Sequence, residues 1–413
     1  MNDKKYFYIM IFSLVLLLVL GVSYAWFNAV IKGNDTAKEQ KVVTGNLELT
    51  FTDDTEVTLS NAVPGDSYTK TISVKNTGTL DAKYNLVWQE LTNEITNDEL
   101  VIEATCKRLN SSNTEEGTCE SISRTPIKSS TIKKNISIEP SVTHEYTIKV
   151  TFIDTGSLQD YNKKKSFSGK LGIEEYKLPT SVSFAEDSWE TIAELVKAGK
   201  TDSYNVGNTK TIDMGTYGTH TVRVANTSTP SECSTTGFSQ SACGFVLEFA
   251  DIITTHKMND TINTNVGGWP ATSMRTFVNN DIYNALPSEL RNVIIDTTTI
   301  SGHGEKDTEN FISTDKLYLL STAEVWAQGS SNTIGDDTAR NVTRQLDYYK
   351  NLGVITSDYS GVIKKNGTSA YWWWLRSART GGSYDFYIVD KPGSWSNANA
   401  SNTNGVSPAF RIG

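Results

Sequence analysis

Between Asn46 and Lys177, apolar residues recur at every second position over most of the chain. Leu47, Leu49 and Phe51 alternate with polar residues, as in a strand with one buried face. Later segments repeat this spacing: Ile72 and Val74; Tyr84, Leu86 and Trp88; Ile136 and Ile138; Tyr146, Ile148, Val150 and Phe152; Phe167, Leu171 and Ile173. Turn residues such as Pro64-Gly65-Asp66 separate the segments. The pattern predicts an antiparallel all-β sandwich over residues 40–178.

The pattern changes after a short predicted linker at residues 179–186. Apolar residues then follow at helical spacing (Trp189, Ile192, Ala193 and Val196), and Asp187 with Glu190 has the spacing of a capping box. Further helices are predicted from Met274 to Leu286, from Pro287, and after Ser321 with Glu324. Strands are predicted at Leu317–Leu320, Tyr371–Ser377, Tyr384–Asp390 and Val406–Ile412. This mixture indicates an α+β domain at residues 187–413.

The first residues form an export signal. Lys4 and Lys5 precede an apolar run, and Ser23-Tyr24-Ala25 places small residues at the cleavage positions. We predict a hydrophobic signal peptide at residues 1–25. The alternative is an uncleaved anchor helix, because residues 6–31 are long enough to cross a bilayer. In both cases the remaining chain is exported, and membrane contact is expected only through residues 6–31 of the uncleaved form.

Composition and charge narrow the classes of partner. Hydrophobic residues make up 38% of the 413 residues and charged residues 21%, which is typical of globular domains. The formal net charge is −9. A negative balance argues against non-specific nucleic-acid binding, which requires a clustered basic surface. We therefore expect no nucleic-acid partner.

The four cysteines form two close pairs, Cys106 with Cys119 and Cys233 with Cys243. An even number of cysteines in an exported chain favours disulfides. Local pairing keeps each bridge within one predicted domain. The alternative is metal binding, although neither pair has the C-x-x-C spacing or the neighbouring histidine typical of zinc sites.

Catalytic and metal-binding motifs are weak. The four histidines form no H-E-x-x-H pair, and there is no G-x-S-x-G or P-loop motif. His303 and Glu305 could meet on a loop, but a surface loop is the simpler interpretation. Calcium could use oxygen ligands from residues without a motif spacing: Asp251, Asn259, Asp260, Asp281, Asp336 and Asp337. We expect no catalytic residue, no metal site and no cofactor, and calcium is left open without motif support.

The aromatic segment Tyr371–Arg376 is predicted to be a central strand covered on both faces. Alternation places Tyr371, Trp373 and Leu375 on one face. Trp372, Trp374 and Arg376 then lie on the other. A buried guanidinium requires a carboxylate or several carbonyls, so Arg376 is predicted to be a structural clamp. The alternative is that Arg376 reaches a ligand.

The stretch from Ser394 to Asn404 is small and polar, with one tryptophan. Serine, asparagine and a rigid aromatic are typical of adaptable recognition loops. We predict a binding patch formed by this loop and the preceding strand: Tyr384, Asp385, Tyr387, Trp395, Asn397, Asn399 and Asn402. The alternative is a solvated loop between two strands.

The N-terminal part resembles the camelysin/TasA group of exported proteins. The resemblance rests on Tyr24-Ala25-Trp26-Phe27, on Val63-Pro64-Gly65-Asp66 and on Val74-Lys75-Asn76-Thr77-Gly78-Thr79-Leu80, and covers about 150 residues. It implies a sandwich fold and, for some members, fibres of a biofilm matrix. We therefore expect a loose strand from Trp26 to Gln40 that can pair with a neighbouring molecule. The Cys106–Cys119 excursion departs from the group.

The C-terminal part resembles an uncharacterised family of bacterial surface domains. The resemblance rests on Trp373-Trp374-Leu375-Arg376-Ser377 and Gly405-Val406-Ser407-Pro408-Ala409-Phe410, with weaker matches upstream, over about 220 residues. It implies a C-type-lectin-like fold that displays a binding surface. Ser407 stands where the family more often has arginine, which puts the contact of that arginine in doubt.

Together these features predict a multidomain extracellular protein of a bacterial cell surface. We expect adhesion or ligand recognition through the C-terminal domain, with a glycan or a protein of a host or neighbouring cell as partner. The first alternative is a structural matrix or fibre subunit that self-assembles through the N-terminal domain. The second is a secreted carbohydrate-active enzyme, since a carboxylate pair for glycoside hydrolysis carries no spacing signature. The leading interpretation is not an enzyme.

Overall fold

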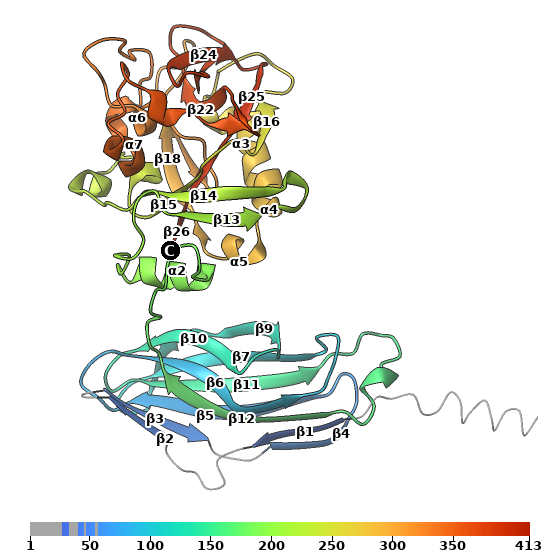
Figure 1. Ribbon diagram of the computed structural model, residues 1–413. Coiled ribbons are helices and arrows are strands. Elements are labelled where there is room, and N and C mark those ends of the chain that lie inside the picture. The colour runs from blue at the N-terminus through green and yellow to red at the C-terminus, as the bar shows by residue number, and fades with distance from the viewer. Residues whose placement is uncertain (1–26, 33–39, 45–46, 54–56) are drawn as a thin grey trace, which may run out of the picture. The chain divides into compact units, whose positions relative to one another are not determined.

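The computed structural model describes all residues except 1–26, 33–39, 45–46 and 54–56. The chain divides into two compact units, Met1–Lys177 and Leu178–Gly413 (Figure 1). The predicted signal peptide or anchor at residues 1–25 lies outside the described residues. Among the described residues, every helix is too short or too polar to span a lipid bilayer. The protein is mostly β-strand, arranged in several sheets, with few helices.

The described residues of the N-terminal unit form strands and one short 3₁₀ helix, η1 (Asp160–Asn162). Its strands are β1 (Phe27–Lys32), β2 (Gln40–Thr44), β3 (Leu47–Asp53), β4 (Val57–Ala62), β5 (Ser67–Asn76), β6 (Ala82–Asn93), β7 (Leu100–Leu109), β8 (Glu115–Thr118), β9 (Ile122–Pro126), β10 (Thr131–Ile138), β11 (Thr143–Phe152) and β12 (Ser166–Glu175). One sheet has the order β10-β6-β12-β1-β4. The other has the order β2-β3-β5-β11-β7-β8, and β9 also pairs with β7.

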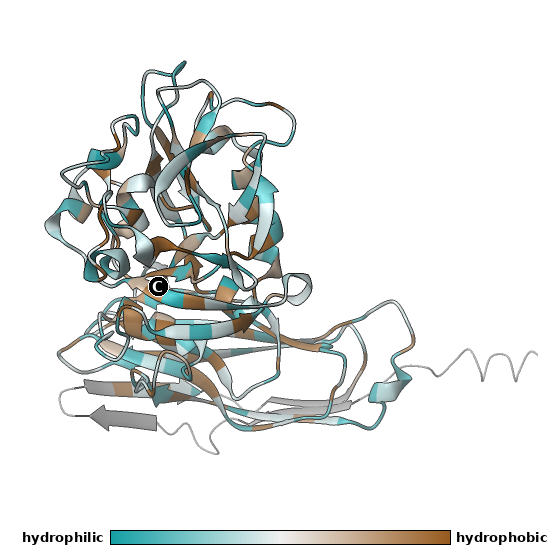
Figure 2. Ribbon diagram, turned by 45° about the horizontal axis from the view of Figure 1, so that its top comes forward, coloured by the Kyte–Doolittle hydropathy of each residue, from teal (hydrophilic) through white to brown (hydrophobic). Residues whose placement is uncertain are grey.

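The alternation of apolar residues explains why these strands pack in two layers. Along β11, Tyr146, Ile148, Val150 and Phe152 are all buried, whereas the intervening Thr147 and Lys149 are exposed. Hydrophobic and hydrophilic bands accordingly alternate along the strands of this unit (Figure 2). Because successive side chains point to opposite faces, one face of each strand joins the core and the other meets solvent.

The N-terminal strand β1 is paired within its own sheet. It runs parallel to β12, where Ala29 aligns with Phe167, and antiparallel to β4, where Val30 aligns with Thr58. The prediction of a loose strand from Trp26 is therefore wrong for Phe27–Lys32, because both edges of that segment already have partners. Residues 33–39 lie outside the described part of the chain.

The C-terminal unit combines short strands with short helices. Its strands are β13 (Thr209–Asp213), β14 (Thr219–Asn226), β15 (Val246–Phe249), β16 (Thr254–Lys257), β17 (Ile294–Ile295), β18 (Thr297–Ser301), β19 (Phe311–Asp315), β20 (Lys365–Asn366), β21 (Ser369–Ala370), β22 (Trp373–Ala378), β23 (Asp385–Val389), β24 (Trp395–Asn399), β25 (Thr403–Val406) and β26 (Ala409–Ile412). They form two five-stranded sheets, β13-β14-β15-β26-β17 and β16-β25-β22-β23-β24, and the pairs β18-β19 and β20-β21.

The α-helices of this unit are α2 (Trp189–Lys197), α3 (Ser273–Phe277), α4 (Tyr283–Ala285), α5 (Ser288–Arg291), α6 (Thr322–Val325) and α7 (Asp347–Asn351), and a π-helical turn, η6 (Val278–Ile282), joins α3 to α4. Short 3₁₀ helices are η2 (Gly215–Tyr217), η3 (Ser231–Ser234), η4 (Gln240–Ala242), η5 (Trp269–Ala271), η7 (Arg340–Val342) and η8 (Ser360–Val362). In the view of Figure 1, α6 and α7 lie on one side of the unit and α3 and α4 on the other.

The helix signals were partly right. Ser321 and Glu324 form the complete capping box at the start of α6. At α2 the cap is Ser188, which accepts a hydrogen bond from the backbone N–H of Thr191, so the predicted start at Asp187 is one residue early. The expected strand at Leu317–Leu320 contributes a single bridge, from Tyr318 to Ala409. The buried backbone there is satisfied partly by the side chains of Asn279 and Arg376 and partly by the backbone of Ala409 and Arg376.

The stretch from Ser394 to Asn404 is not a loop. It contains β24 and the start of β25, and β24 pairs along its full length with β23. Its small polar residues are compatible with a strand because backbone pairing, and not side-chain hydrophobicity, holds it in the sheet. In a strand, the side chains of the predicted binding residues point alternately to the two faces of the sheet.

Candidate functional site

The core of the C-terminal unit is built on β22. Trp373, Trp374, Leu375 and Arg376 are all fully buried in this strand. The indole N–H of Trp373 donates to the Val362 carbonyl, and that of Trp374 to the His256 carbonyl. The strand is therefore covered on both faces, and its polar atoms are satisfied by neighbouring backbone.

Arg376 contacts a carboxylate, the irregular backbone at Leu319 and the strand β18. Its two terminal nitrogens lie 2.6 and 2.5 Å from the two carboxylate oxygens of Glu324, a bidentate pair. It also donates to the carbonyls of Leu319 and Ile300, at 2.8 and 3.2 Å. Burial alone would raise the pKa of Glu324, but the adjacent guanidinium outweighs it and lowers the pKa. Arg376 has no exposed surface.

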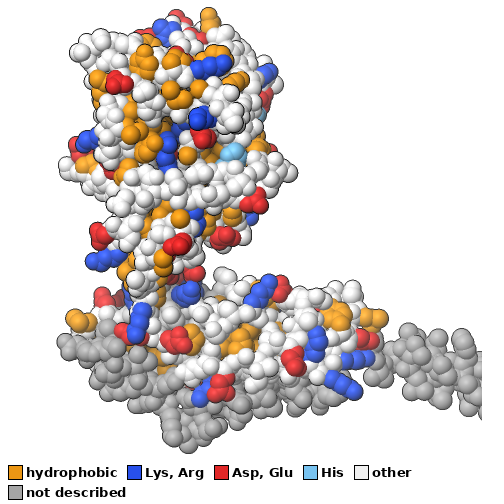
Figure 3. Space-filling view, in the orientation of Figure 1, with side chains coloured by type: hydrophobic (Ala, Val, Ile, Leu, Met, Phe, Trp, Pro, Cys, Tyr) orange, Lys and Arg blue, Asp and Glu red, His pale blue; other side chains and the backbone are white. Residues whose placement is uncertain are grey.

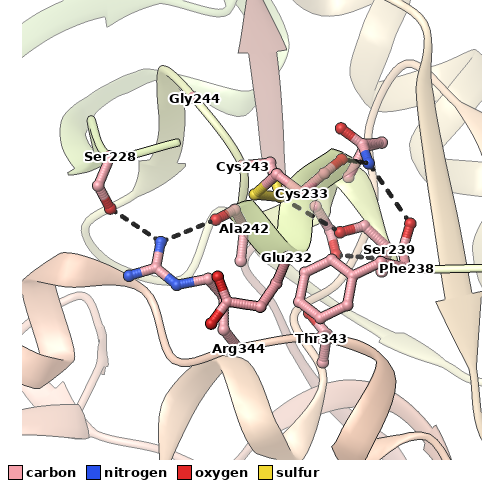
Figure 4. The surroundings of a disulfide bond; sticks show 12 residues. Ser228, Glu232, Cys233, Phe238, Ser239, Ala242, Cys243, Gly244, Thr343 and Arg344 are labelled. Carbon is pink, nitrogen blue, oxygen red and sulfur yellow. Dashed lines mark hydrogen bonds between the residues drawn. A yellow bond between two sulfur atoms is a disulfide. The ribbon is translucent and has the colours of Figure 1, made fainter. Parts of the chain in front are cut away.

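Both predicted disulfides are present, Cys106–Cys119 and Cys233–Cys243. The second one closes a loop that leads to the Arg376 cluster, because the Ser241 hydroxyl donates to Glu324 and accepts from Arg376. Figure 4 shows Arg344 beside this disulfide, with its guanidinium between the Ser228 hydroxyl and the Ala242 carbonyl, at 2.8 and 3.1 Å. The bridge and the arginine together fix the loop.

A second buried ionic cluster was not predicted. Lys364 is fully buried, and its Nζ lies 2.7 Å from Glu248, 2.7 Å from the Phe249 carbonyl and 2.9 Å from the Ser407 hydroxyl. Burial lowers the pKa of Lys364 to about 8, although Glu248 opposes this shift. Ser407, noted in the sequence as a departure from arginine, is thus a partner of this lysine. Lys364 and Glu248 are 116 residues apart, so no local motif could reveal the pair.

The predicted binding patch is divided by the structure. Tyr384 is exposed, but Asp385 and Tyr387 are buried. Trp395 is half-buried: its indole N–H donates to the Asn332 carbonyl at 2.8 Å, and its ring meets Tyr387 edge to face. Of the residues predicted to form one binding patch, Trp395 is therefore only partly exposed and Tyr387 is not exposed.

Strand alternation explains the division. Trp395, Asn397 and Asn399 are opposite Val389, Tyr387 and Asp385 in the ladder, on one face of the β23–β24 pair. Ser396 and Ala398 point to the other face. A loop could bring all the polar residues to one surface, but a strand cannot.

A pocket of about 440 Å³ opens beside β24 and the start of β25. Its lining residues are all uncharged: Trp372, Ile388, Ser396, Asn397, Ala398, Asn402, Thr403 and Asn404. Two of the predicted residues, Asn397 and Asn402, belong to it. Asn404 is only 6% exposed, and its side-chain Nδ2 has no hydrogen-bond partner in the protein. The Nδ2 atom is itself inaccessible to solvent, so Asn404 lines the pocket through its other atoms.

Trp372 forms the aromatic wall of the pocket and is 38% exposed. It directly precedes β22, and the N–H of Gly405 donates to its carbonyl at 2.8 Å. A Cβ at Gly405 would lie only 2.6 Å from Ile252 and 2.8 Å from that carbonyl, so glycine permits the close approach. The Lys391 ammonium lies 4.4 Å from the Trp372 ring centroid. Sequence alternation had placed Trp372 in the core, and it failed because the strand begins one residue later.

The residues considered for calcium are mostly apart. Asp260 and Asp281 line one pocket with His256, whereas Asp336 and Asp337 lie elsewhere, paired with Arg379 and Thr322 respectively. His303 is half-buried and its Nδ1 contacts the Gly304 carbonyl at 2.7 Å, while Glu305 is exposed. Neither set forms a group of three ligands among the described residues.

One group among the described residues has metal-ligand types within reach of one another: Cys106, Cys119 and His144. The two sulfurs are joined in the disulfide. The Nδ1 of His144 lies 3.0 Å from the Tyr84 hydroxyl, which in turn lies 2.9 Å from the Tyr146 hydroxyl. Burial lowers the pKa of His144 to about 4, so the imidazole is neutral at physiological pH.

Comparison with known families finds two matches. Residues 4–90 match the family described as Camelysin metallo-endopeptidase, and residues 245–413 match a domain of unknown function, DUF6273. No curated protein matches the chain. The resemblances of the N-terminal part to camelysin and of the C-terminal part to an uncharacterised domain family are confirmed at this level, over shorter stretches than predicted.

The expectation that the protein is not an enzyme conflicts with the match to a metallo-endopeptidase family and is withdrawn. The same match points to a metal, whereas no cofactor was expected. The matched residues 4–90 contain neither histidine nor cysteine, the ligands that zinc peptidases use most. The donor set of that segment therefore does not fit such a zinc site, and no catalytic step is assigned to a metal there. The C-terminal part is similar to a family whose function is itself undefined.

Proposed function

We propose that this is a surface or exported matrix protein whose C-terminal unit recognises a neutral, hydrogen-bonding ligand in the pocket beside Trp372. The single observation that carries the proposal is Trp372, which is 38% exposed and lines this pocket together with uncharged polar side chains. The match of residues 4–90 to the camelysin family supports a location at the cell surface. We extend the proposal to adhesion and to a C-type-lectin-like display of this pocket.

A carbohydrate fits the chemistry of the pocket best. Sugars present C–H groups that pack on an indole and hydroxyls that both donate and accept hydrogen bonds. Trp372 supplies the aromatic surface, and Asn404, Asn402 and Thr403 supply amides and a hydroxyl. The uncharged lining favours neutral sugars. Lys391, which lies over Trp372, offers a route to an acidic sugar at the rim.

The test is a glycan array with the full-length protein, followed by titration calorimetry with the best ligand. Trp372→Ala should weaken binding by about thirtyfold, as expected for an anchoring aromatic. Asn404→Leu should weaken it by about fivefold, the value of one hydrogen bond. Tyr384→Ala is the matched control, because Tyr384 is similarly exposed (44% against 38%) but is not in the pocket.

Binding that survives Trp372→Ala and is lost with Tyr384→Ala would place recognition outside the pocket, at Tyr384. Lys391→Gln separates the ligand classes: it should leave a neutral sugar unaffected and weaken an acidic one. An array without any carbohydrate signal would reject this ligand class.

A second candidate function is peptidase activity, which the match to Camelysin metallo-endopeptidase favours. The test is cleavage of casein by the purified protein before and after chelation, with zinc or calcium restored afterwards. Chelator-sensitive cleavage that returns with the metal supports this function. His144 lies outside residues 4–90, so activity should survive His144→Ala if the metal ligands lie within that segment.

A further inference from the structure

The end of the sandwich near Cys106 brings together three side chains of the kinds that bind zinc. Cys106 lies on β7 and is 2% exposed, His144 lies on the neighbouring β11 and is 3% exposed, and half-buried Cys119 follows β8. One sulfur from each cysteine and one ring nitrogen of His144 all lie within 4.8 Å of one another.

The backbone holds this arrangement independently of the disulfide. Cys106 is opposite Tyr146 in the ladder between β7 and β11, so His144, two residues away, shares its inward face. β8 pairs with β7, where Lys107 aligns with Thr118, and this pairing delivers Cys119 next to Cys106. Three hydrogen-bonded strands therefore position the three ligands, and breaking the S–S bond leaves these ladders intact.

We propose that Cys106, Cys119 and His144 form a thiol-gated metal site, which binds one Zn²⁺ when the disulfide is reduced. A dithiol or phosphine reductant supplies the two electrons, and two protons convert the S–S bond to two thiols. Zinc then binds both sulfurs as thiolates and releases both protons. In the oxidised protein the sulfurs are bonded to each other and uncharged, so the site is closed.

The surroundings suit zinc better than a hard cation. Two thiolates and an imidazole are an established zinc set, and they leave a fourth tetrahedral position for water. With Zn–S bonds of about 2.3 Å, the sulfurs must separate to about 3.8 Å. Half-buried Cys119, beyond the end of β8, is the side chain with room to turn. The Tyr84 hydroxyl, which contacts Nδ1 of His144 from the opposite sheet, orients the ring from outside the ligand shell.

The experiment uses the full chain, reduced with a phosphine, freed of reductant without oxygen, and titrated with Co²⁺ and then Zn²⁺. The reduced protein should bind one equivalent of Co²⁺ with a thiolate-to-cobalt charge-transfer band, and Zn²⁺ should displace it. The oxidised protein should show no such band. Circular dichroism of each form checks that the sandwich persists after reduction.

Variants assign the site. Cys106→Ser with Cys119→Ser should abolish the band, His144→Ala should change or remove it, and Tyr84→Phe should weaken binding about tenfold. Cys233→Ser with Cys243→Ser is the matched control and should bind as the parent does, because that pair has no third ligand within reach among the described residues. A folded, reduced protein that binds no stoichiometric Co²⁺, or whose band depends on Cys233 and Cys243, would overturn the proposal.

Discussion

The two units use buried polar groups in different ways. In the N-terminal unit, long ladders satisfy the backbone, and the buried ion pair of Lys70 with Asp53 joins two neighbouring strands. The cluster at His144 consists of uncharged groups that bridge the two sheets, Tyr84 to His144 and Tyr146. In the C-terminal unit, Arg376 donates to the carbonyls of Leu319 and Ile300 and pairs with Glu324. In this unit a cation donates the hydrogen bonds to backbone carbonyls that a neighbouring strand donates in the sandwich.

The difference teaches how the C-terminal unit keeps its backbone irregular without losing stability. A buried carbonyl without a partner costs free energy, and short strands leave many such carbonyls. Lys364 repeats the device at the Phe249 carbonyl, and Arg340 at the Trp326 carbonyl. Backbone whose carbonyls are satisfied by side chains does not need a straight ladder. It can therefore curve around a pocket, as it does at Trp372.

The largest expected effect is at Arg376. Replacing it with alanine leaves Glu324 buried and uncompensated and should lower the free energy of unfolding by about 3–5 kcal/mol. Combining Arg376→Met with Glu324→Leu should be less harmful than Arg376→Ala, since both charges are removed together. Denaturant unfolding of the full chain measures both. A loss below about 1 kcal/mol for Arg376→Ala would show that the cluster is not what holds this backbone.

Trp395, which lies in β24, should contribute more to stability than Trp372, which lies beside that strand in the pocket. Trp395 is anchored to Asn332 and Tyr387, so Trp395→Ala should cost about 2 kcal/mol of stability. Trp372→Ala should stay within about 1 kcal/mol, because that ring is partly exposed at the pocket. Thermal unfolding checks both variants. Equal losses would mean that Trp372 is part of the core.

A smaller effect is expected in the sandwich. Tyr84→Phe removes neutral hydrogen bonds to His144 and Tyr146 and should cost about 1 kcal/mol. The transition of the N-terminal unit should shift, and that of the C-terminal unit should not. A loss as large as that of Arg376→Ala would erase the contrast between neutral and ionic clusters.

The smallest effects concern two carboxylates with opposite pKa shifts. Burial would raise the pKa of Asp347, but hydrogen bonds from Ser228, Arg344 and backbone N–H groups outweigh it and lower the pKa. Its stabilisation is present above the ordinary value of 3.8 and disappears as the pH falls through the folded value. Burial raises the pKa of Asp390, so its contribution is full below 3.8 and is lost as the pH rises through the folded value.

Asp347→Asn should therefore destabilise the protein at pH 7 and flatten its loss of stability in acid. Asp390→Asn should be neutral or slightly stabilising at pH 7. Each change is expected to be below about 1 kcal/mol because solvent screens both groups. Unfolding midpoints between pH 3 and pH 7 measure them, and shifts of the same sign would contradict the assignment.

Sequence reasoning located strands well where one face is buried. The alternation at Tyr146–Phe152 predicts β11 because a register error would expose its apolar side chains. It failed at Ser394–Asn404, where polar residues form a strand that is held by backbone pairing with the preceding strand β23. The sequence identified two residues of the pocket, Asn397 and Asn402. It did not identify Trp372 and Asn404, because their places in the pocket depend on where β22 begins and how β25 pairs. Lys364 and Glu248 meet only through the fold.

The central claim, that the pocket beside Trp372 is the recognition site, is tested most directly at Asn404. Nuclear magnetic resonance of the side-chain amides can follow Asn404 while the best ligand from the glycan array is added. The Asn404 Nδ2 resonances should shift and become protected from exchange with the same midpoint as calorimetric binding. Saturable binding that leaves these resonances unchanged while Tyr384 or Asn399 shifts would contradict the account.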